Sequence, residues 1–115
     1  MKDSNYYTNR LLIYDPEDDK FLCGNPHTNS DPHTNNAFLL WASLEYINSN
    51  KEYCDTICYY YPPDVIIESF DDYYVWMIEE DKNFIKGVES RLMLVPALIR
   101  TSFDIENVYF EEAFR

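Results

Sequence analysis

Two short apolar runs near the start of the chain are separated by a polar segment. The runs are Arg10–Tyr14 (RLLIY) and Lys20–Cys23 (KFLC), and the segment between them is DPEDD at residues 15–19. Pro and Asp are typical turn residues, because Pro fixes φ and Asp hydrogen-bonds its own backbone. We therefore predict a β-hairpin at the N-terminus. The following residues 24–36 are polar and lack periodicity, which predicts a loop.

Apolar residues then recur with a helical period in two successive segments. Asn36 is a suitable N-cap, and a helix from there to about Asn48 places on one face Ala37, Leu40, Trp41, Leu44 and Ile47. A second, shorter helix is predicted by the same spacing in Cys54, Ile57, Cys58 and Tyr61. Pro62 and Pro63 require this second helix to end by about Tyr60.

The segment Asp64–Glu80 is rich in β-branched residues, but its periodicity is helical. At about 100° per residue, one face collects the side chains of Ile66, Ile67, Phe70, Tyr73, Tyr74, Met77 and Ile78. The opposite face collects the carboxylates of Asp64, Glu68, Asp71, Asp72 and Glu79. We predict one helix with an outward acidic stripe, and keep a hairpin turning at Asp71–Asp72 as the alternative.

Two further elements complete the predicted fold. Asp81 suits the cap of a helix that Pro96 interrupts and whose apolar stripe is formed by Phe84, Val88, Leu92 and Val95. Gly87 lowers the stability of this helix. Residues 101–114 begin with alternating apolar and acidic positions, which predicts a strand. The expected fold class is α+β: one compact domain over residues 1–115, with an N-terminal β-hairpin, then helices, and a C-terminal strand.

The net charge limits the classes of partner. The chain has 21 acidic and 9 basic residues, giving a net charge of −12, and its 46% hydrophobic content is sufficient for a folded core. Binding to DNA, RNA or an anionic membrane requires Lys and Arg against phosphates. We therefore expect no direct binding to nucleic acid or membrane, and a partner that is neutral or basic.

The expected location is the cytoplasm. Residues 1–9 lack the apolar core of a signal peptide, and no run approaches the ~20 apolar residues of a membrane span. The three cysteines, Cys23, Cys54 and Cys58, cannot all pair within the chain, which fits free thiols in a reducing compartment. On the predicted second helix Cys54 and Cys58 would share one face, as two small buried side chains.

Residues 52–81 are the strongest functional signal. They include nine carboxylates and six of the eleven tyrosines but no Lys or Arg. Solubility alone accounts for an acidic surface. The tyrosines favour a protein interface, because Tyr offers a large contact area at low entropy cost. On one helix the five stripe carboxylates would span about 22 Å at ~1.5 Å per residue, a density comparable with one DNA phosphate every ~3.4 Å.

We therefore expect the acidic stripe and its neighbouring tyrosines to bind the partner. A second acidic patch is expected at the predicted turn, and a third at Glu111 and Glu112. The predicted partner-binding residues are Asp64, Glu68, Asp71, Asp72, Glu79, Tyr73, Tyr74, Asp15, Glu17, Asp18 and Asp19.

In size and charge the chain resembles the small acidic DNA-mimic proteins that occupy the DNA-binding surface of bacterial histone-like HU or of restriction enzymes. It also resembles the immunity proteins that neutralise basic nuclease toxins. These families share no motif, so the resemblance implies no site residue. It implies a non-enzymatic inhibitor whose partner is a basic DNA- or RNA-binding protein, either a histone-like protein or a nuclease.

A metal-dependent enzyme is the alternative from another class. Cys23, His27 and His33, with Asp31 between the histidines, could supply three or four ligands, although their spacing matches no standard zinc motif. The chain has two glycines and lacks a phosphate loop, a nucleophile elbow and a zinc-protease motif. We expect no catalytic residue, no metal and no cofactor.

Overall fold

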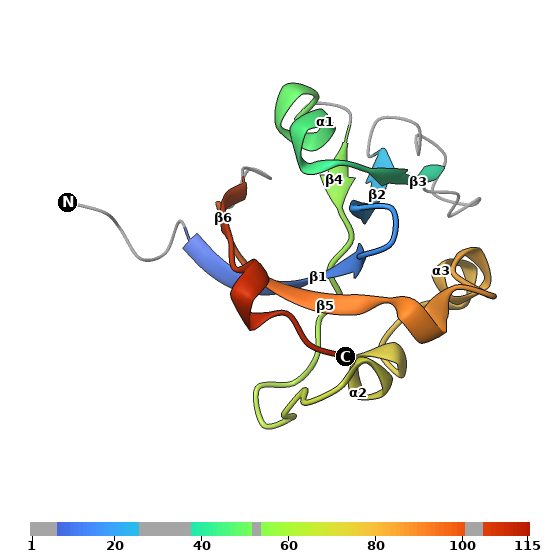
Figure 1. The fold of residues 1–115 in the computed structure, drawn as a ribbon. Coiled ribbons are helices and arrows are strands. Elements are labelled where there is room, and N and C mark those ends of the chain that lie inside the picture. The colour runs from blue at the N-terminus through green and yellow to red at the C-terminus, as the bar shows by residue number, and fades with distance from the viewer. Residues whose placement is uncertain (1–6, 26–37, 52–53, 101–104) are drawn as a thin grey trace, which may run out of the picture.

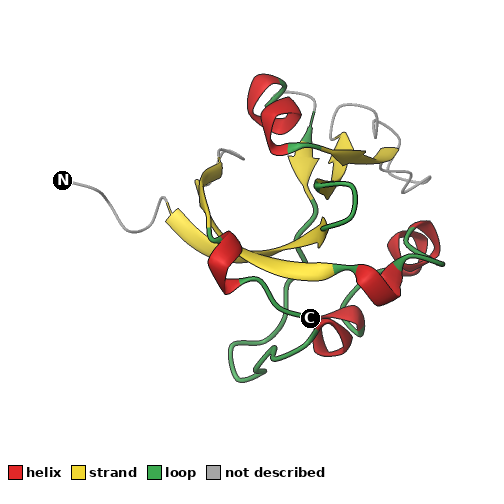
Figure 2. Cartoon of the chain, in the orientation of Figure 1, coloured by secondary structure: helices red, strands yellow, loops and turns green. Residues whose placement is uncertain are grey.

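The computed structural model describes residues 7–25, 38–51, 54–100 and 105–115, which form an antiparallel sheet flanked by short helices (Figures 1 and 2). The strands are β1 (Tyr7–Asp15), β2 (Lys20–Asn25), β3 (Phe38–Ala42), β4 (Asp55–Thr56), β5 (Met93–Arg100) and β6 (Ile105–Val108). The helices are α1 (Leu44–Ser49), α2 (Phe70–Tyr74) and α3 (Glu79–Phe84), with 3-10 turns at Glu89–Arg91 and Phe110–Glu112. The α+β class is confirmed, with more sheet and less helix than predicted.

The predicted N-terminal hairpin is present, and its strands separate close to the turn. The strand order is β3-β2-β1-β5-β6, with β4 also paired to β2. Within the described residues β1 and β2 pair at two positions, Tyr14 with Phe21 and Asp15 with Lys20. β1 continues along β5, whereas β2 pairs with β3 and β4. Figure 1 accordingly shows a bent sheet, with β2, β3 and β4 in one arm and β1, β5 and β6 in the other.

The sheet is covered on both faces, so its strands are apolar on both sides. Consecutive residues such as Leu12 and Ile13 are fully buried in different cores. The first core is covered by α1 and residues 105–113, and its buried members are Leu12, Phe21, Cys23, Ala42, Ile47, Cys54, Val95, Ala97 and Ile99. The second is covered by α2 and α3, and its buried members are Ile13, Leu22, Phe70, Tyr73, Met77, Ile85, Leu92 and Leu94.

The helix predicted for residues 36–48 is wrong in its first half. Residues 38–42 form β3, in which Leu40 packs against the first core and Trp41 against the second. Helix α1 begins after Ser43, whose hydroxyl accepts a hydrogen bond from the Tyr46 N–H at 3.1 Å. A strand buried on both faces is apolar at successive positions, and such a run also satisfies helical spacing. Residues 36 and 37 lie outside the described part of the chain.

The two helices predicted between residues 54 and 80 are also wrong. Residues 55–56 form β4, and residues 57–69 have no helix or strand. The proposed hairpin at Asp71–Asp72 is absent as well, because these residues lie in the first turn of α2. Ser69 starts this helix by accepting a hydrogen bond from the Asp72 N–H at 3.2 Å. The apolar spacing of Phe70 and Tyr73 thus reflects one short helix and not a long one.

The helix predicted from Asp81 to Val95 is replaced by α3, a 3-10 turn and β5. Asp81 lies inside α3 and does not cap it. Gly87 has a φ of 97°, a left-handed conformation, and lies between the end of α3 and the 3-10 turn. The predicted C-terminal strand is confirmed over Ile105–Val108, and residues 101–104 lie outside the described residues. No helix in the described ranges is long and apolar enough to cross a membrane.

Candidate functional site

Residues 57–84 cover one face of the sheet, and we call them the covering segment. Buried side chains of α2, including Phe70 and Tyr73, pack this segment onto the second core. Six carboxylates of the segment are exposed: Asp64, Glu68, Asp71, Asp72, Glu79 and Glu80. Its one basic residue, Lys82, is half-buried, lies 3.9 Å from the Glu79 carboxylate and sits 4.8 Å from the centre of the Tyr74 ring. The outer surface of the segment is therefore strongly acidic.

The covering segment also exposes large apolar side chains among these carboxylates. They are Tyr60, Ile66, Val75, Ile78 and Phe84. Tyr60 is 84% exposed and Ile66 is 74% exposed. In the rest of the described chain only Tyr46 and Phe110 belong to this class. Five of the seven exposed large apolar side chains of the described residues, and a large share of the exposed carboxylates, thus belong to one segment.

The predicted stripe carboxylates are exposed, but they do not form one helical row. Asp64 and Glu68 precede α2. Asp71 and Asp72 lie in its first turn, and Glu79 begins α3. The Asp72 carboxylate also accepts a hydrogen bond from the Glu68 N–H at 3.0 Å, so it helps to fix the loop before α2. The carboxylates form a cluster along a folded segment, and the extended row of about 22 Å is wrong.

Tyr73, predicted to contact the partner, is completely buried at 0% exposure. Its hydroxyl accepts a hydrogen bond from the Tyr59 N–H at 2.7 Å and donates one to the Leu11 carbonyl at 3.1 Å. Burial raises the pKa of Tyr73, which keeps the hydroxyl protonated and able to donate. Tyr73 therefore joins the covering segment to β1 and is not a surface contact. Tyr74 is half-buried beside Lys82.

The acidic turn after β1 is organised around Arg91, which lies just before β5. Asp15 is 2% exposed and accepts hydrogen bonds from Arg91 Nη2 at 2.8 Å and Nε at 3.1 Å. Glu17 and Asp18 lie 3.0 and 3.7 Å from the same guanidinium. The predicted partner-binding role of Asp15 is therefore corrected to a structural one. The turn presents less unpaired negative charge than its sequence suggests.

Local contacts also fix the conformation of this turn. Burial alone would raise the pKa of Asp15, but hydrogen bonds from Arg91 and from the Glu17 N–H outweigh it and hold the pKa below its usual value. Tyr14 donates its hydroxyl hydrogen to Asp19. Burial, and then this carboxylate, raises the pKa of Tyr14 to about 12. Asp19 has a left-handed φ of 56°, which Asp tolerates better than most residues.

Two other carboxylates are partly or fully removed from water. Asp81 in α3 is 4% exposed, and burial raises its pKa to about 6. No ion pair to Asp81 is present in the described ranges. Asp55 in β4 is half-buried, and burial raises its pKa to about 6 although the charge of Arg10 acts in the opposite direction. Both carboxyl groups therefore titrate closer to neutral pH than a solvated Asp.

The three cysteines are free thiols. Cys23 and Cys54 are buried in the first core, and Cys58 is half-buried. Burial raises the pKa of each thiol, to about 12 for Cys58. Cys54 and Cys58 do not share a helix face, because the helix predicted there is absent. Of the residues that the structure describes, no three His, Cys, Asp or Glu are grouped to hold a metal. Other residues of the alternative metal site lie outside that part: His27, Asp31 and His33.

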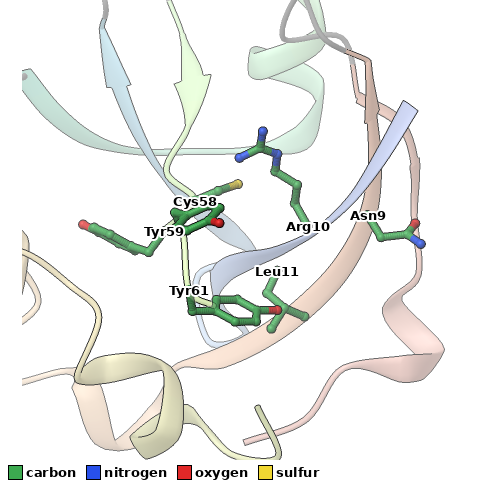
Figure 3. A pocket seen from close by; sticks show the side chains of 7 residues that line it. Asn9, Arg10, Leu11, Cys58, Tyr59 and Tyr61 are labelled. Atoms are coloured by element: carbon green, nitrogen blue, oxygen red, sulfur yellow. The ribbon is translucent and has the colours of Figure 1, made fainter. Parts of the chain in front are cut away.

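A pocket of about 280 Å³ lies where β1 separates from the chain that follows β4 (Figure 3). It is lined by Asn9, Arg10, Leu11, Cys58, Tyr59, Tyr60 and Tyr61. In Figure 3 the side chain of Arg10 extends to one side of β1 and that of Leu11 to the other. The pocket thus reaches around the edge of a strand. The Tyr59 hydroxyl is buried and has no hydrogen-bond partner among the residues that the structure describes.

Comparison with known proteins adds no relative to this description. No known family, curated protein or solved structure matches the chain.

Proposed function

We propose that this domain is a non-enzymatic inhibitor that binds a basic nucleic-acid-binding protein and blocks its nucleic-acid site. One observation carries the proposal: the covering segment exposes six carboxylates and five large apolar side chains, while its one basic residue is half-buried. Such a surface complements a partner that presents Lys and Arg around apolar contacts. The apolar side chains supply most of the binding free energy, and the carboxylates supply association rate and salt dependence.

The carboxylates would compete with phosphates for the same Lys and Arg side chains. Because they cluster on short elements, α2 of five residues and α3 of six, the surface suits a compact basic site better than a long groove. The partner classes that meet this description are histone-like proteins and nucleases. The free cysteines of the chain support a cytoplasmic location for the complex.

An immunity protein against a basic nuclease toxin is the second candidate. It is favoured by the exposure of Tyr60 and Ile66, at 84% and 74%. Tight one-to-one inhibitor interfaces depend on aromatic and apolar anchors at their centre, and these two side chains suit that role. Binding that survives moderate salt and is lost on Ile66→Ser would favour the nuclease inhibitor over the histone-like partner.

A matched pair of triple variants tests the proposed surface. The covering triple, Glu68→Gln with Glu79→Gln and Glu80→Gln, removes three exposed charges from the covering segment while keeping side-chain shape. The control triple removes three exposed charges elsewhere: Glu45→Gln, Glu111→Gln and Glu112→Gln. We expect affinity for HU or a basic nuclease at low salt to fall about tenfold in the covering triple, or about 1.4 kcal/mol, and to change little in the control. Equal losses in the two variants would show that net charge, and not this surface, determines binding.

A further inference from the structure

Another pocket lies where α2 meets the 3-10 turn before β5 and the C-terminal end of the chain. Its volume is about 410 Å³, and it is lined by Phe70, Asp71, Tyr74, Glu89, Ser90 and Arg115. Three of these residues belong to α2 and two to the 3-10 turn at Glu89–Arg91. Figure 1 accordingly shows the C-terminal end of the chain beside α2. One wall of the pocket therefore belongs to the covering segment, and the rest to other parts of the chain.

The charged residues that line this pocket leave one negative charge in excess. Asp71, which is exposed, and Glu89, which is half-buried, each contribute a carboxylate. The cation among the lining residues is Arg115, whose Nε and Nη2 groups donate hydrogen bonds to the carbonyls of Leu92 and Glu89, both at 2.9 Å. In the described ranges no ion pair joins Arg115 to either carboxylate. The pocket carboxylates are therefore not neutralised by a direct contact with this guanidinium.

Two aromatic rings supply the apolar part of the pocket. The ring centres of Phe70 and Tyr74 are 6.3 Å apart, and Tyr74 is the more exposed of the two. Lys82 lies 4.8 Å from the centre of the Tyr74 ring, but it does not line the pocket. A cationic side chain with a long apolar stem can place the stem on such rings and the charge beside the carboxylates.

We propose that this pocket binds one arginine side chain of the basic partner, with its guanidinium beside Asp71 and Glu89. The proposal rests on the proposed function, because that function supplies the basic partner. A guanidinium presents several N–H donors in a planar fork and can serve two carboxylates at once, whereas the ammonium of lysine is a compact point charge. Arginine is also enriched in protein interfaces, and lysine is depleted.

Blocked amino acids test the ligand. The probe is Nα-acetyl-arginine amide, compared with the citrulline analogue, which has a similar shape without the charge, and with the lysine analogue. An NMR titration of the parent chain at low salt follows the amide signals of Tyr74 and Ser90. We expect the arginine probe to bind at least about tenfold more tightly than the citrulline probe and about threefold more tightly than the lysine probe.

Two results of this titration would overturn the inference. Equal affinity for the arginine and citrulline probes, or no binding of either, would show that the pocket does not recognise a guanidinium. Equal affinity for the arginine and lysine probes would show that it attracts any cation.

Matched variants locate the bound probe. Asp71→Asn removes a carboxylate that lines the pocket, and Asp64→Asn removes an exposed carboxylate of the covering segment that does not line it. We expect affinity for the arginine probe to fall about threefold to fivefold in Asp71→Asn and to change less than about twofold in Asp64→Asn. Equal losses would place the probe outside the pocket and overturn the inference. If Asp71→Asn were poorly folded, the three probes on the parent chain would still decide the question.

Binding to the whole partner separates this inference from the proposed function. The covering triple leaves every residue of the pocket unchanged, so it should keep its affinity for the arginine probe within about twofold while its affinity for HU or a basic nuclease falls. Asp71→Asn should weaken binding to that partner more than Asp64→Asn does.

The two proposals can therefore fail independently. Equal partner affinity in Asp71→Asn and Asp64→Asn, with a loss in the covering triple alone, would leave the proposed function standing and overturn the arginine pocket. Equal partner affinity in the covering and control triples, with a loss of the arginine probe in Asp71→Asn, would overturn the proposed function and leave a guanidinium site.

Discussion

At the level of single residues, Tyr73 takes the place of a strand-to-strand contact. Its hydroxyl lies between the Leu11 carbonyl of β1 and the Tyr59 N–H, where the two backbones are too far apart to pair directly. Its ring packs edge-on against the rings of Tyr59 and Tyr61. One side chain therefore fixes the covering segment to the sheet next to the pocket.

Tyr73→Phe should destabilise the protein measurably. The change removes both hydrogen bonds and leaves a partly buried carbonyl and a partly buried N–H without this partner, at a cost of about 1–3 kcal/mol in the free energy of unfolding. Tyr74→Phe is the matched control and should change that free energy by less than about 0.5 kcal/mol, because Tyr74 is half-buried and its hydroxyl makes no hydrogen bond in the described ranges. Urea unfolding of the two variants measures the difference. Equal costs would contradict the role assigned to Tyr73.

Asp81 should make stability depend on pH. Burial raises its pKa from 3.8 to about 6, so the folded state binds the proton more strongly than the unfolded state. The free energy of unfolding should therefore decrease as pH rises from about 4 to 6 and stay reduced above that range. Asp55, with its pKa also raised to about 6, adds to the same slope.

Asp81→Asn should remove part of this pH dependence. The variant should be more stable than the parent at pH 7 and similar to it at pH 4, as measured by unfolding at each pH. Glu80→Gln, at a neighbouring exposed carboxylate, is the control for the loss of one negative charge from α3. A variant that is less stable than the parent at pH 7 would show that the ionised Asp81 has a favourable partner.

At the level of elements, the short helix α2 has a buried apolar residue at its start and an exposed one at its end. Phe70 is 3% exposed and packs in the second core, whereas Val75, at the end of the helix, is 66% exposed. Phe70→Ala should cost about 3–5 kcal/mol in the free energy of unfolding, and Val75→Ala should stay within about 0.5 kcal/mol. The Val75 variant should instead weaken binding to the partner. Stability loss in both variants would mean that Val75 is not available to a partner.

The ion pair between Arg91 and Asp15 connects the first hairpin to the entry of β5. Arg91→Gln should lower the thermal midpoint more than Glu17→Gln does, because the first change leaves the buried Asp15 without its cation and the second affects an exposed partner. The difference between the two variants should decrease as pH falls below about 4, where Asp15 becomes protonated in the unfolded state. A constant difference across pH would indicate that Arg91 acts by packing alone.

The sequence predicts some elements well because their signals are local. The hairpin was predictable from Pro16 and the Asp residues of its turn. β3 and β5 were not, because strands buried on both faces lose the alternation that identifies a strand. Pro96 also argued for an interruption, yet it occupies β5 opposite Leu11, where its missing N–H is not needed for pairing with β1.

The sequence likewise predicts only part of the candidate site. The stripe carboxylates are exposed in the structure, but the single helix from which we predicted their exposure is absent. The burial of Tyr73 and of Asp15 could not be predicted, because it depends on contacts between distant parts of the sequence. Tyr73 contacts Leu11, 62 positions before it, and Asp15 contacts Arg91, 76 positions after it.

At the level of the whole molecule, several cations are used within the fold while many carboxylates remain exposed. Arg91 and Arg100 pair with carboxylates, and Arg115 donates hydrogen bonds to the carbonyls of Leu92 and Glu89. The covering segment itself holds one basic residue, the half-buried Lys82, against six exposed carboxylates. The net charge is −12, and the excess of exposed carboxylates over basic groups on the covering segment is the physical basis of the proposed attraction to a basic partner.

The most direct test of that claim is displacement of fluorescently labelled duplex DNA from HU, and in parallel from a basic nuclease, at two salt concentrations. The account predicts that the chain displaces DNA from at least one of them and does so less effectively as salt rises. The covering triple should require about tenfold more protein and show a weaker salt dependence, while the control triple should behave like the parent. No displacement by the parent chain, or equal displacement by the two triple variants, would contradict the central claim.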